Sequence, residues 1–538
     1  MLLKTWPLLL LLLVGGALRV ARIASDECAS VEIDGAEYCR IAESIAAGQP
    51  LHGMLPGPAT MMPSLYPFTI AAAMPLCGGD SVLAARVVSL LASLASITLA
   101  WWLAQRMAGS SAALAAATAL AFAPLFVLAG SSTFAEALQL ALLLGALIAL
   151  HATLTAQHMR SACLAGALFG LAALTRIESV VLAALAVFWM LLPRAAAAPA
   201  AAMGGRTALR VRNAALCALV CALFLLPWAA HLRSATGAWR IEAKSARVAA
   251  TVERFALGHD YASSNYALDA QGNALGPWLR PDVPWSGTPA DPSPRGLMAV
   301  LADHPREVLS YWAGNLKRTG WWMLSGHILS SALVVLGSLW GWRALRRRHA
   351  QPALATLLLM MVIAVVLLGC LYKPVLRYSA TAGMLLWLLA AVGAASFAAH
   401  SARPRLLVSA LMLLGVLTTL SGVPERLQEF AEGRDDTSTR IGHALRALPL
   451  PPGPLLCTDA RVPFACGRDW LPLPAAPSPQ ALMIHAEHCG AAALLWSADK
   501  AASAQRPGSF AQETALMLPG FSESSAAPQG WRVFVRVR

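Results

Sequence analysis

The sequence predicts an all-α polytopic membrane domain followed by a small α/β domain. Of the 538 residues, 57% are hydrophobic and 13% are charged, whereas soluble domains carry about 25% charged residues. The apolar residues form runs that recur from Trp6 to Leu420, each close to the roughly 20 residues that cross a hydrocarbon core. We therefore assign residues 1–422 to the membrane domain and residues 423–538 to a domain outside the membrane.

The first apolar run could be a cleaved secretory signal, because Lys4 precedes it. Arg19 and Arg22, however, lie where a cleavable signal carries small uncharged residues. We interpret the run as the first transmembrane helix.

The length criterion predicts about eleven transmembrane helices. The predicted spans are 6–24, 82–103, 112–130, 134–150, 161–175, 177–193, 214–230, 323–342, 352–371, 376–398 and 405–422.

The basic residues orient these spans. With the N-terminus in the cytoplasm, the inner loops hold thirteen of the 41 Lys and Arg and no Asp or Glu. The other 28 Lys and Arg equal the 28 Asp and Glu in number, so the net charge of +13 lies on the cytoplasmic side. The positive-inside rule then predicts a bacterial inner-membrane protein with a cytoplasmic N-terminus and a periplasmic C-terminus. The same asymmetry explains the basic charge without nucleic-acid binding.

Three segments are expected outside: 25–81, 231–322 and 423–538. They hold six of the ten cysteines, and Cys28 with Cys39 and Cys457 with Cys466 are candidate disulfides, although the sequence does not determine the pairing. No spacing resembles a zinc site.

The first outer segment concentrates carboxylates before a short amphipathic helix that we predict over 35–47. Asp34 and Glu37 stand at the start of this helix, in the spacing of a capping box, where Asp34 would accept hydrogen bonds from free N–H groups. The alternative is a general base at the boundary between water and lipid. The two roles are compatible.

Several strings in the membrane domain resemble the GT-C superfamily, which includes protein O-mannosyltransferases and lipid A aminoarabinose transferases. The strings are Asp34-Gly35-Ala36-Glu37-Tyr38 with Ala42 and Gly48-Gln49-Pro50, Arg19 at the end of the first span, Pro63-Ser64-Leu65-Tyr66-Pro67, Ala135-Glu136-Ala137-Leu138 and Gly170-Leu171-Ala172-Ala173-Leu174-Thr175-Arg176. The resemblance covers residues 1 to about 422 and rests on the order of these strings.

The resemblance implies roles for particular residues. Because an Asp of the first outer loop is the proposed catalytic base in the superfamily, it implies this role for Asp34, with substrate contacts at Glu37 and Tyr66. Family members often carry Lys or a second acid near the Pro-rich segment, where this sequence has Met61-Met62. This departure leaves open how the donor phosphate is held.

Charged residues at the outer ends of later helices are further candidates. Glu136 is either a solvated residue at the membrane boundary or a second acid that faces the site and pairs with an Arg. Arg176 and Glu178 either form a structural salt bridge or take part in the site. The resemblance favours a site role for Arg176.

The segment between the spans 352–371 and 376–398 has a composition that suits phosphate binding. Lys373, Arg377 and Tyr378 lie in it, and Arg and Lys both bind phosphate oxygens. The alternative is ordinary anchoring at the interface, since the same residue types mark membrane boundaries. The resemblance implies that cations here stabilise the leaving polyprenyl phosphate.

The C-terminal segment is expected to contain strands at 454–457, 491–496 and 531–537 and a helix at 480–487. It contains no nucleophile triad and no metal motif, so we expect it to position an acceptor or to cover the site.

These observations predict an inverting glycosyltransferase with Asp34 as base and Glu136 in support. The donor would be a polyprenyl-phosphate sugar, the acceptor an extracytoplasmic lipid, glycan or protein, and the other partners membrane lipids. No separate cofactor is predicted, and the sequence does not decide whether a divalent metal is required.

Three other functions fit parts of the sequence. A transporter or flippase would place ionisable groups near the bilayer centre, whereas these spans carry few charges there. A ligase that transfers whole lipid-linked glycans has the same loop composition as a transferase of single sugars. A structural assembly subunit is the third alternative.

Overall fold

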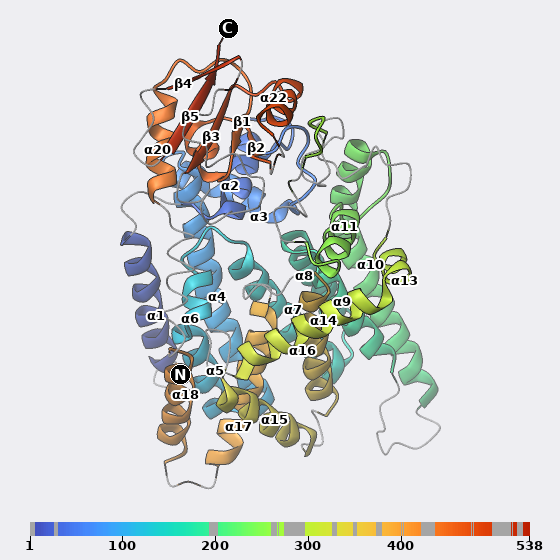
Figure 1. Cartoon of the computed structure of the whole chain (residues 1–538). Coiled ribbons are helices and arrows are strands. Elements are labelled where there is room, and N and C mark those ends of the chain that lie inside the picture. The colour runs from blue at the N-terminus through green and yellow to red at the C-terminus, as the bar shows by residue number, and fades with distance from the viewer. Residues whose placement is uncertain are drawn as a thin grey trace.

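The computed structural model is a helical body with a small sheet domain at one end (Figure 1). The residues that it describes are 6–25, 31–192, 203–259, 266, 268–273, 296–324, 331–347, 352–372, 379–399, 401, 403–420, 436–474, 476, 478–497, 518, 520–524 and 531–537.

Within the described residues, six helices are long and apolar enough to cross a membrane. They are α1 (Trp6–Ala24), α4 (Ser81–Ala108), α7 (Glu136–Ala156), α10 (Met203–Thr236), α16 (Pro352–Tyr372) and α17 (Ala380–Ala398). Shorter apolar helices pack among them: α3 (Leu65–Ala73) with the 3₁₀ turn η2 (Met74–Cys77), α5 (Ser110–Phe122), α8 (Met159–Thr175), α9 (Ser179–Leu191) and α18 (Pro404–Leu420). The polytopic helical fold predicted from hydropathy is therefore confirmed.

The predicted span 323–342 is described only in part, because residues 325–330 lie outside the described residues. Its first two residues belong to α14 (Pro305–Leu324), and residues 332–342 belong to α15 (Ala332–Arg347).

Helices α5 and α6 (Pro124–Ala129) are separated by a break at Ala123, which takes an extended conformation. Proline cannot donate the next helical hydrogen bond and disfavours helical geometry in the residue before it. The fully buried Arg19 of α1 compensates for the break. Its guanidinium donates to the carbonyls of Leu120 (2.8 Å), Ala121 (3.1 Å) and Phe126 (3.1 Å).

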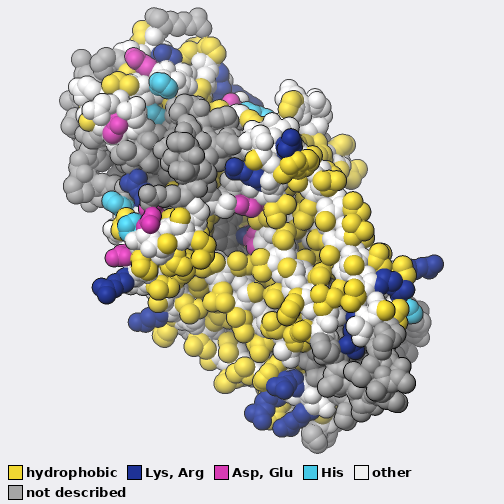
Figure 2. Space-filling model, turned by 90° about the vertical axis from the view of Figure 1, so that its right-hand side faces the viewer, with side chains coloured by type: hydrophobic (Ala, Val, Ile, Leu, Met, Phe, Trp, Pro, Cys, Tyr) yellow, Lys and Arg dark blue, Asp and Glu magenta, His cyan; other side chains and the backbone are white. Residues whose placement is uncertain are grey.

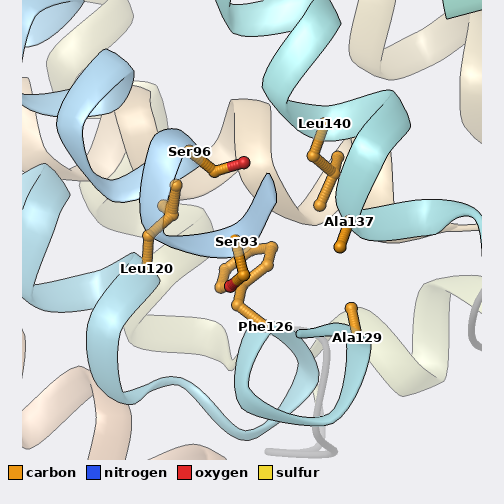
Figure 3. A pocket seen from close by; sticks show the side chains of 7 residues that line it. All are labelled: Ser93, Ser96, Leu120, Phe126, Ala129, Ala137 and Leu140. Atoms are coloured by element: carbon orange, nitrogen blue, oxygen red, sulfur yellow. The ribbon is translucent and has the colours of Figure 1, made fainter. Parts of the chain in front are cut away.

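A small cavity of about 10 Å³ lies between α4, α6 and α7 near this break. Figure 3 shows Ser93, Phe126 and Ala137 on its walls. This volume accommodates about one water molecule. A sugar or a phosphate group needs far more room, so this cavity is not the candidate site.

Charge is distributed unevenly over the surface. Figure 2 shows a broad hydrophobic belt. On this face the visible acidic side chains lie toward the end that carries the sheet domain, whereas Lys and Arg are visible both there and at the opposite end.

The layer next to the sheet domain contains the short helix predicted in the first outer segment, α2 (Ile33–Ala46). Tyr38 and Ala42 of α2 pack in one cluster with Ile70 of α3 and Ala85 of α4. A second group in the outer segments, α11 (Ser245–Ala256) and α13 (Leu297–Asp303), packs with α14.

The C-terminal domain contains a five-stranded sheet in the order β2-β1-β3-β5-β4. Its elements are α20 (Asp436–Arg446), β1 (Leu455–Cys457), α21 (Arg461–Cys466), β2 (Trp470–Pro472), α22 (Pro479–His488), β3 (Ala493–Ser497), β4 (Phe521–Glu523) and β5 (Trp531–Arg536). Strand β1 pairs in parallel with β2 and β3, and β5 pairs antiparallel with β3 and β4. The α/β type, three strands and α22 agree with the prediction, whereas β2, β4, α20 and α21 were not predicted.

The candidate disulfides are not formed among the described cysteines. Cys39, Cys457 and Cys466 are buried and form no disulfide, and Cys28 lies outside the described residues. Cys39 and Cys457 pack in hydrophobic clusters, as buried free cysteines commonly do.

Candidate active site

The first turn of α2 is docked on the turn that leads into α7. The carboxylate of Glu32, the residue before α2, accepts a hydrogen bond from the backbone N–H of Thr133 (3.0 Å) and another from its hydroxyl. Gly35 makes the close approach possible, because a Cβ at this position would lie 1.8 Å from Oγ1 of Thr133. Thr133 stands three residues before Glu136, so two predicted site segments that are distant in sequence meet here.

Asp34 does not cap this helix. The capping-box prediction is wrong, since Glu32 occupies the cap position and α2 begins at Ile33. Asp34 is half-buried within the first turn. There a negative charge is favoured by the helix dipole.

Glu37 holds the outer loop that follows α2. Its carboxylate accepts the backbone N–H of Met54 at 2.6 Å. Gly53 allows this contact, because a Cβ there would lie 1.9 Å from the Glu37 carboxylate. Burial raises the pKa of Glu37 to about 7, and the charge of Asp34 also raises it. The two carboxylates predicted on this helix therefore lie within electrostatic range of each other.

Arg176 links the outer ends of three helices. Its guanidinium forms an ion pair with Glu136, the first residue of α7, and another with Glu178 at 2.6 Å. Nearby, the side-chain amide of Gln139 donates to the hydroxyl of Ser179 at 2.9 Å. The inter-helix salt bridge considered for Arg176 is thus present. Glu136 is only 4% exposed, and its carboxylate is paired with Arg176.

Lys244 is a further charged residue here that the sequence analysis did not select. Its Nζ lies 3.6 Å from Sδ of Met62. Its charge lowers the pKa of Glu37 and of Glu178, although burial acts in the opposite direction on both. Lys244 therefore lies within electrostatic range of both α2 and the Arg176 ion pairs. In the sequence, Lys244 is an isolated Lys in the outer segment 231–322, and such a residue is only a weak indication of a site.

Tyr66 is a packing residue in this structure. It is 0% exposed, and its hydroxyl bonds with the carbonyl of Ala85 (3.2 Å) and the hydroxyl of Ser89 (2.9 Å). Its ring also packs edge-on against Tyr38. A side chain without exposed surface cannot contact a substrate, so the geometry does not support the substrate contact predicted for Tyr66.

The predicted phosphate-binding residues Lys373, Arg377 and Tyr378 lie outside the described residues. The end of α16 just before them is well anchored. Three side chains of α14 satisfy its last carbonyls: Asn315 donates to Cys370 (2.9 Å), Trp312 to Leu371 (3.0 Å) and Tyr311 to Tyr372 (2.5 Å). Tyr372 also packs against the cluster that holds α11, whose N-cap is Lys244.

Figure 2 shows a hollow above the hydrophobic belt, with acidic and basic side chains at its edge. Within the described part of the chain, no group of three or more His, Cys, Asp or Glu is placed to hold a metal ion.

Comparisons with known proteins agree with this arrangement. Residues 62–231 match the family described as dolichyl-phosphate-mannose-protein mannosyltransferase. ArnT from Cupriavidus metallidurans, solved with undecaprenyl phosphate, superposes with a TM-score of 0.56 at 14% identity, over 99% of this chain and 98% of ArnT. The oligosaccharyltransferase AglB from Archaeoglobus fulgidus, solved with an inhibitory peptide and a dolichol-phosphate, superposes with a TM-score of 0.53 at 15% identity, over 93% and 70% of the two chains. This chain has the GT-C fold. The search of curated proteins gave no match.

The GT-C resemblance expected from the sequence is therefore confirmed. The family match includes Glu136, Arg176 and Met62 but begins after Asp34 and Glu37. Another structure of the A. fulgidus oligosaccharyltransferase contains Zn and sulfate.

Proposed function

We propose that this chain is an integral-membrane glycosyltransferase that transfers a sugar from a polyprenyl-phosphate donor to an acceptor outside the cytoplasm. The same proposal places it in a bacterial inner membrane, with the N-terminus in the cytoplasm and the C-terminal domain in the periplasm. The charge distribution of the loops supports this orientation. The solved GT-C structures that contain a polyprenyl phosphate support the class of donor.

In the proposed reaction, a hydroxyl or other nucleophile of the acceptor attacks the anomeric carbon of the sugar. Asp34 accepts the proton of the nucleophile as the new bond forms. The bond between the anomeric carbon and the phosphate oxygen breaks with its electron pair on the oxygen, and the configuration inverts. The leaving polyprenyl phosphate gains one negative charge, which nearby cations stabilise in the transition state.

The observation that carries the proposal is the docking of α2 on the turn before α7. It brings the helix turn that holds Asp34 toward the segment that holds Glu136. Glu136 and Glu178 in turn fix the guanidinium of Arg176. A carboxylate base and a cation on neighbouring elements suit a reaction that removes a proton and builds charge on a phosphate. Lys373 and Arg377 would add further cations, with Tyr378 beside them.

The decisive experiment replaces the base with its neutral isostere. We expect Asp34→Asn to lower the rate of sugar transfer by about 10²- to 10⁴-fold, the range typical for loss of a general base. The assay uses the full-length protein in nanodiscs and a panel of polyprenyl-phosphate sugars. Full activity of D34N would remove Asp34 from the mechanism.

Asp80→Asn is the matched control. Asp80 caps α4 by accepting the N–H groups of Val82 (2.8 Å) and Leu83 (3.0 Å), and Asn caps a helix about as well as Asp. D80N should therefore retain activity and stability. Movement of a lipid-linked sugar across vesicles by the wild type, without any sugar transfer, would favour the transporter alternative instead.

A further inference from the structure

Three arginines from distant parts of the chain meet where the sheet domain contacts α2. The guanidinium of Arg40, on α2, donates to the carbonyl of Arg468 at 3.2 Å. Nη2 of Arg446, the last residue of α20, would lie 3.1 Å from a Cβ added to Gly467. Burial raises the pKa of the neighbouring Cys466 thiol, and the charges of all three arginines oppose this shift. The three cations therefore form one group, the Arg40–Arg446–Arg468 cluster.

Two of these guanidiniums keep N–H donors without an acceptor. Among the described residues, the exposed Arg446 forms neither a hydrogen bond nor an ion pair. Arg468 donates from Nη2 to the carbonyl of Leu450 at 3.1 Å, and no carboxylate in the described part of the chain pairs with it. A guanidinium has five N–H donors. An anion can therefore bind to both arginines without displacing a carboxylate from either.

The charges around the cluster do not cancel. Glu43 pairs with Arg40 at 3.3 Å. The C-terminal ends of α20 and α21 also lie here, and each helix end carries about half a negative charge. Asp469, which follows the cluster in the chain, pairs with the ring of His52 instead. Glu43 and the two helix ends together offset about two of the three positive charges, so a net charge of about +1 remains.

The cluster lies at the level of the lipid headgroups. Helix α2 is located between the sheet domain and the helical body (Figure 1). Glu43, the partner of Arg40, also accepts the hydroxyl of Ser81 at 2.7 Å. Ser81 is the first residue of α4, a helix long enough to cross the membrane. Arg40 is thus two contacts away from the end of a membrane-crossing helix, the depth at which Arg and Lys meet phospholipid headgroups.

We propose that the Arg40–Arg446–Arg468 cluster binds the phosphate of an anionic phospholipid, in the leaflet that the sheet domain faces. The fork of a guanidinium matches phosphate oxygens. A phosphodiester headgroup such as that of phosphatidylglycerol carries the one negative charge that balances the cluster. Two exposed residues just after α20, Ala447 and Pro449, are apolar and suit contact with the lipid. The bound lipid holds the sheet domain against the membrane beside its junction with α2.

The test places the full-length protein in phosphatidylcholine nanodiscs with a photoreactive phosphatidylglycerol that carries a diazirine near its headgroup. Mass spectrometry should find cross-links in the segments 447–451 and 467–470. Each basic residue near a membrane surface contributes about fivefold to the binding of an anionic lipid. R446Q/R468Q should therefore lower the cross-link yield by about tenfold or more, and R446K/R468K should retain most of it.

Arg440→Gln is the matched control. Arg440 is another exposed arginine of α20, six residues before Arg446 and thus about 9 Å away along the helix axis. R440Q removes the same charge and should leave the cross-link yield unchanged. If the double variant folds poorly, R446Q serves alone, because Arg446 has no hydrogen bond to lose among the described residues. Its yield should fall about fivefold.

Three outcomes would overturn the proposal. The first is an equal yield with a photoreactive phosphatidylcholine, and the second is a yield that persists undiminished in R446Q. The third is competition by soluble glycerol phosphate that equals competition by unlabelled phosphatidylglycerol, because the cluster would then bind phosphate from solution and not a lipid surface. The assay contains no sugar donor, so its result is independent of the proposed glycosyltransferase activity.

Discussion

Glu37 shows how a single carboxyl group couples the outer site to pH. Burial raises its pKa to about 7 and the charge of Asp34 adds to this, while the Met54 N–H and the charges of His52 and Lys244 act against it. The pKa in the folded protein lies above the unfolded value near 4.5. The stability that Glu37 contributes is therefore fully present below about pH 4.5 and is lost as the pH rises through about 7.

We expect Glu37→Gln to flatten this dependence, because Gln carries no charge and its carbonyl can still accept the Met54 N–H. Relative to the wild type, E37Q should gain stability as the pH rises from about 4.5 to above 7. Thermal unfolding in detergent across this range measures the difference between the two proteins. Parallel curves for E37Q and the wild type would show that Glu37 does not titrate in the folded protein as expected.

Candidate site residues could be selected from the sequence where local pattern and resemblance coincided. Asp34, Glu136 and Arg176 were selected in this way, and the structure pairs Glu136 with Arg176. Lys244 was missed because its neighbours Met62, Glu37 and Glu178 are all distant in sequence. Tyr66 was selected from a sequence motif whose residues also pack in the core. A sequence motif alone does not show whether a tyrosine ring is buried or exposed.

At the scale of elements, the break between α5 and α6 depends on one intramembrane arginine. Arg19 donates to carbonyls on both sides of the break and to the hydroxyl of Ser93 at 2.8 Å. Each buried carbonyl left without a donor costs about 1–3 kcal/mol. Arg19→Met should therefore lower the free energy of unfolding by about 3 kcal/mol or more.

Unfolding of the R19M variant in detergent, followed by circular dichroism, measures this loss. Arg19→Lys should be less damaging, since the ammonium can still donate to some of the carbonyls. If R19M were as stable as the wild type, water molecules would have to supply the missing hydrogen-bond donors. A structure of the variant would show whether such water occupies the small cavity beside Ser93.

Hydropathy predicted the helices of the body well because lipid and a packed bundle select the same apolar side chains. The composition of a segment indicates whether it lies in an apolar environment, but it does not indicate how a helix in that segment is oriented. The five-stranded sheet was only partly predicted, since β2 and β4 were missed. Their length of three residues does not explain this by itself, because β1 is equally short and was predicted.

At the scale of the whole molecule, the sheet domain is docked on the first outer segment. The N–H of Trp470 donates to the carbonyl of Met54 at 2.7 Å, and Arg40 of α2 donates to the carbonyl of Arg468 at 3.2 Å. The Arg40 guanidinium also lies over the ring of Phe464. Met54 thus contacts both the sheet domain and Glu37, so the domain that was expected to cover the site is joined directly to its acidic helix.

His52 should make this docking sensitive to pH. Its Nε2 lies 3.1 Å from Oδ1 of Asp469, and its Nδ1 lies 3.1 Å from the carbonyl of Gly57. The hydrogen bond with Asp469 raises the pKa of His52, although partial burial opposes the shift. The contribution of the protonated ring is fully present below the unfolded value of about 6.5 and is lost as the pH rises through the raised value.

We therefore expect the amide of Trp470 to exchange its hydrogen faster as the pH rises above about 6.5, after correction for the intrinsic exchange rate. Hydrogen exchange read by mass spectrometry measures this in the full-length protein. His52→Gln and Asp469→Asn should each reduce the pH dependence, because either change abolishes this titrating pair, while Glu37 still titrates beside Met54. The amides at the centre of β3 should remain protected. Equal pH dependence in the wild type and in both variants would show that another group controls the junction between the sheet domain and the outer loop.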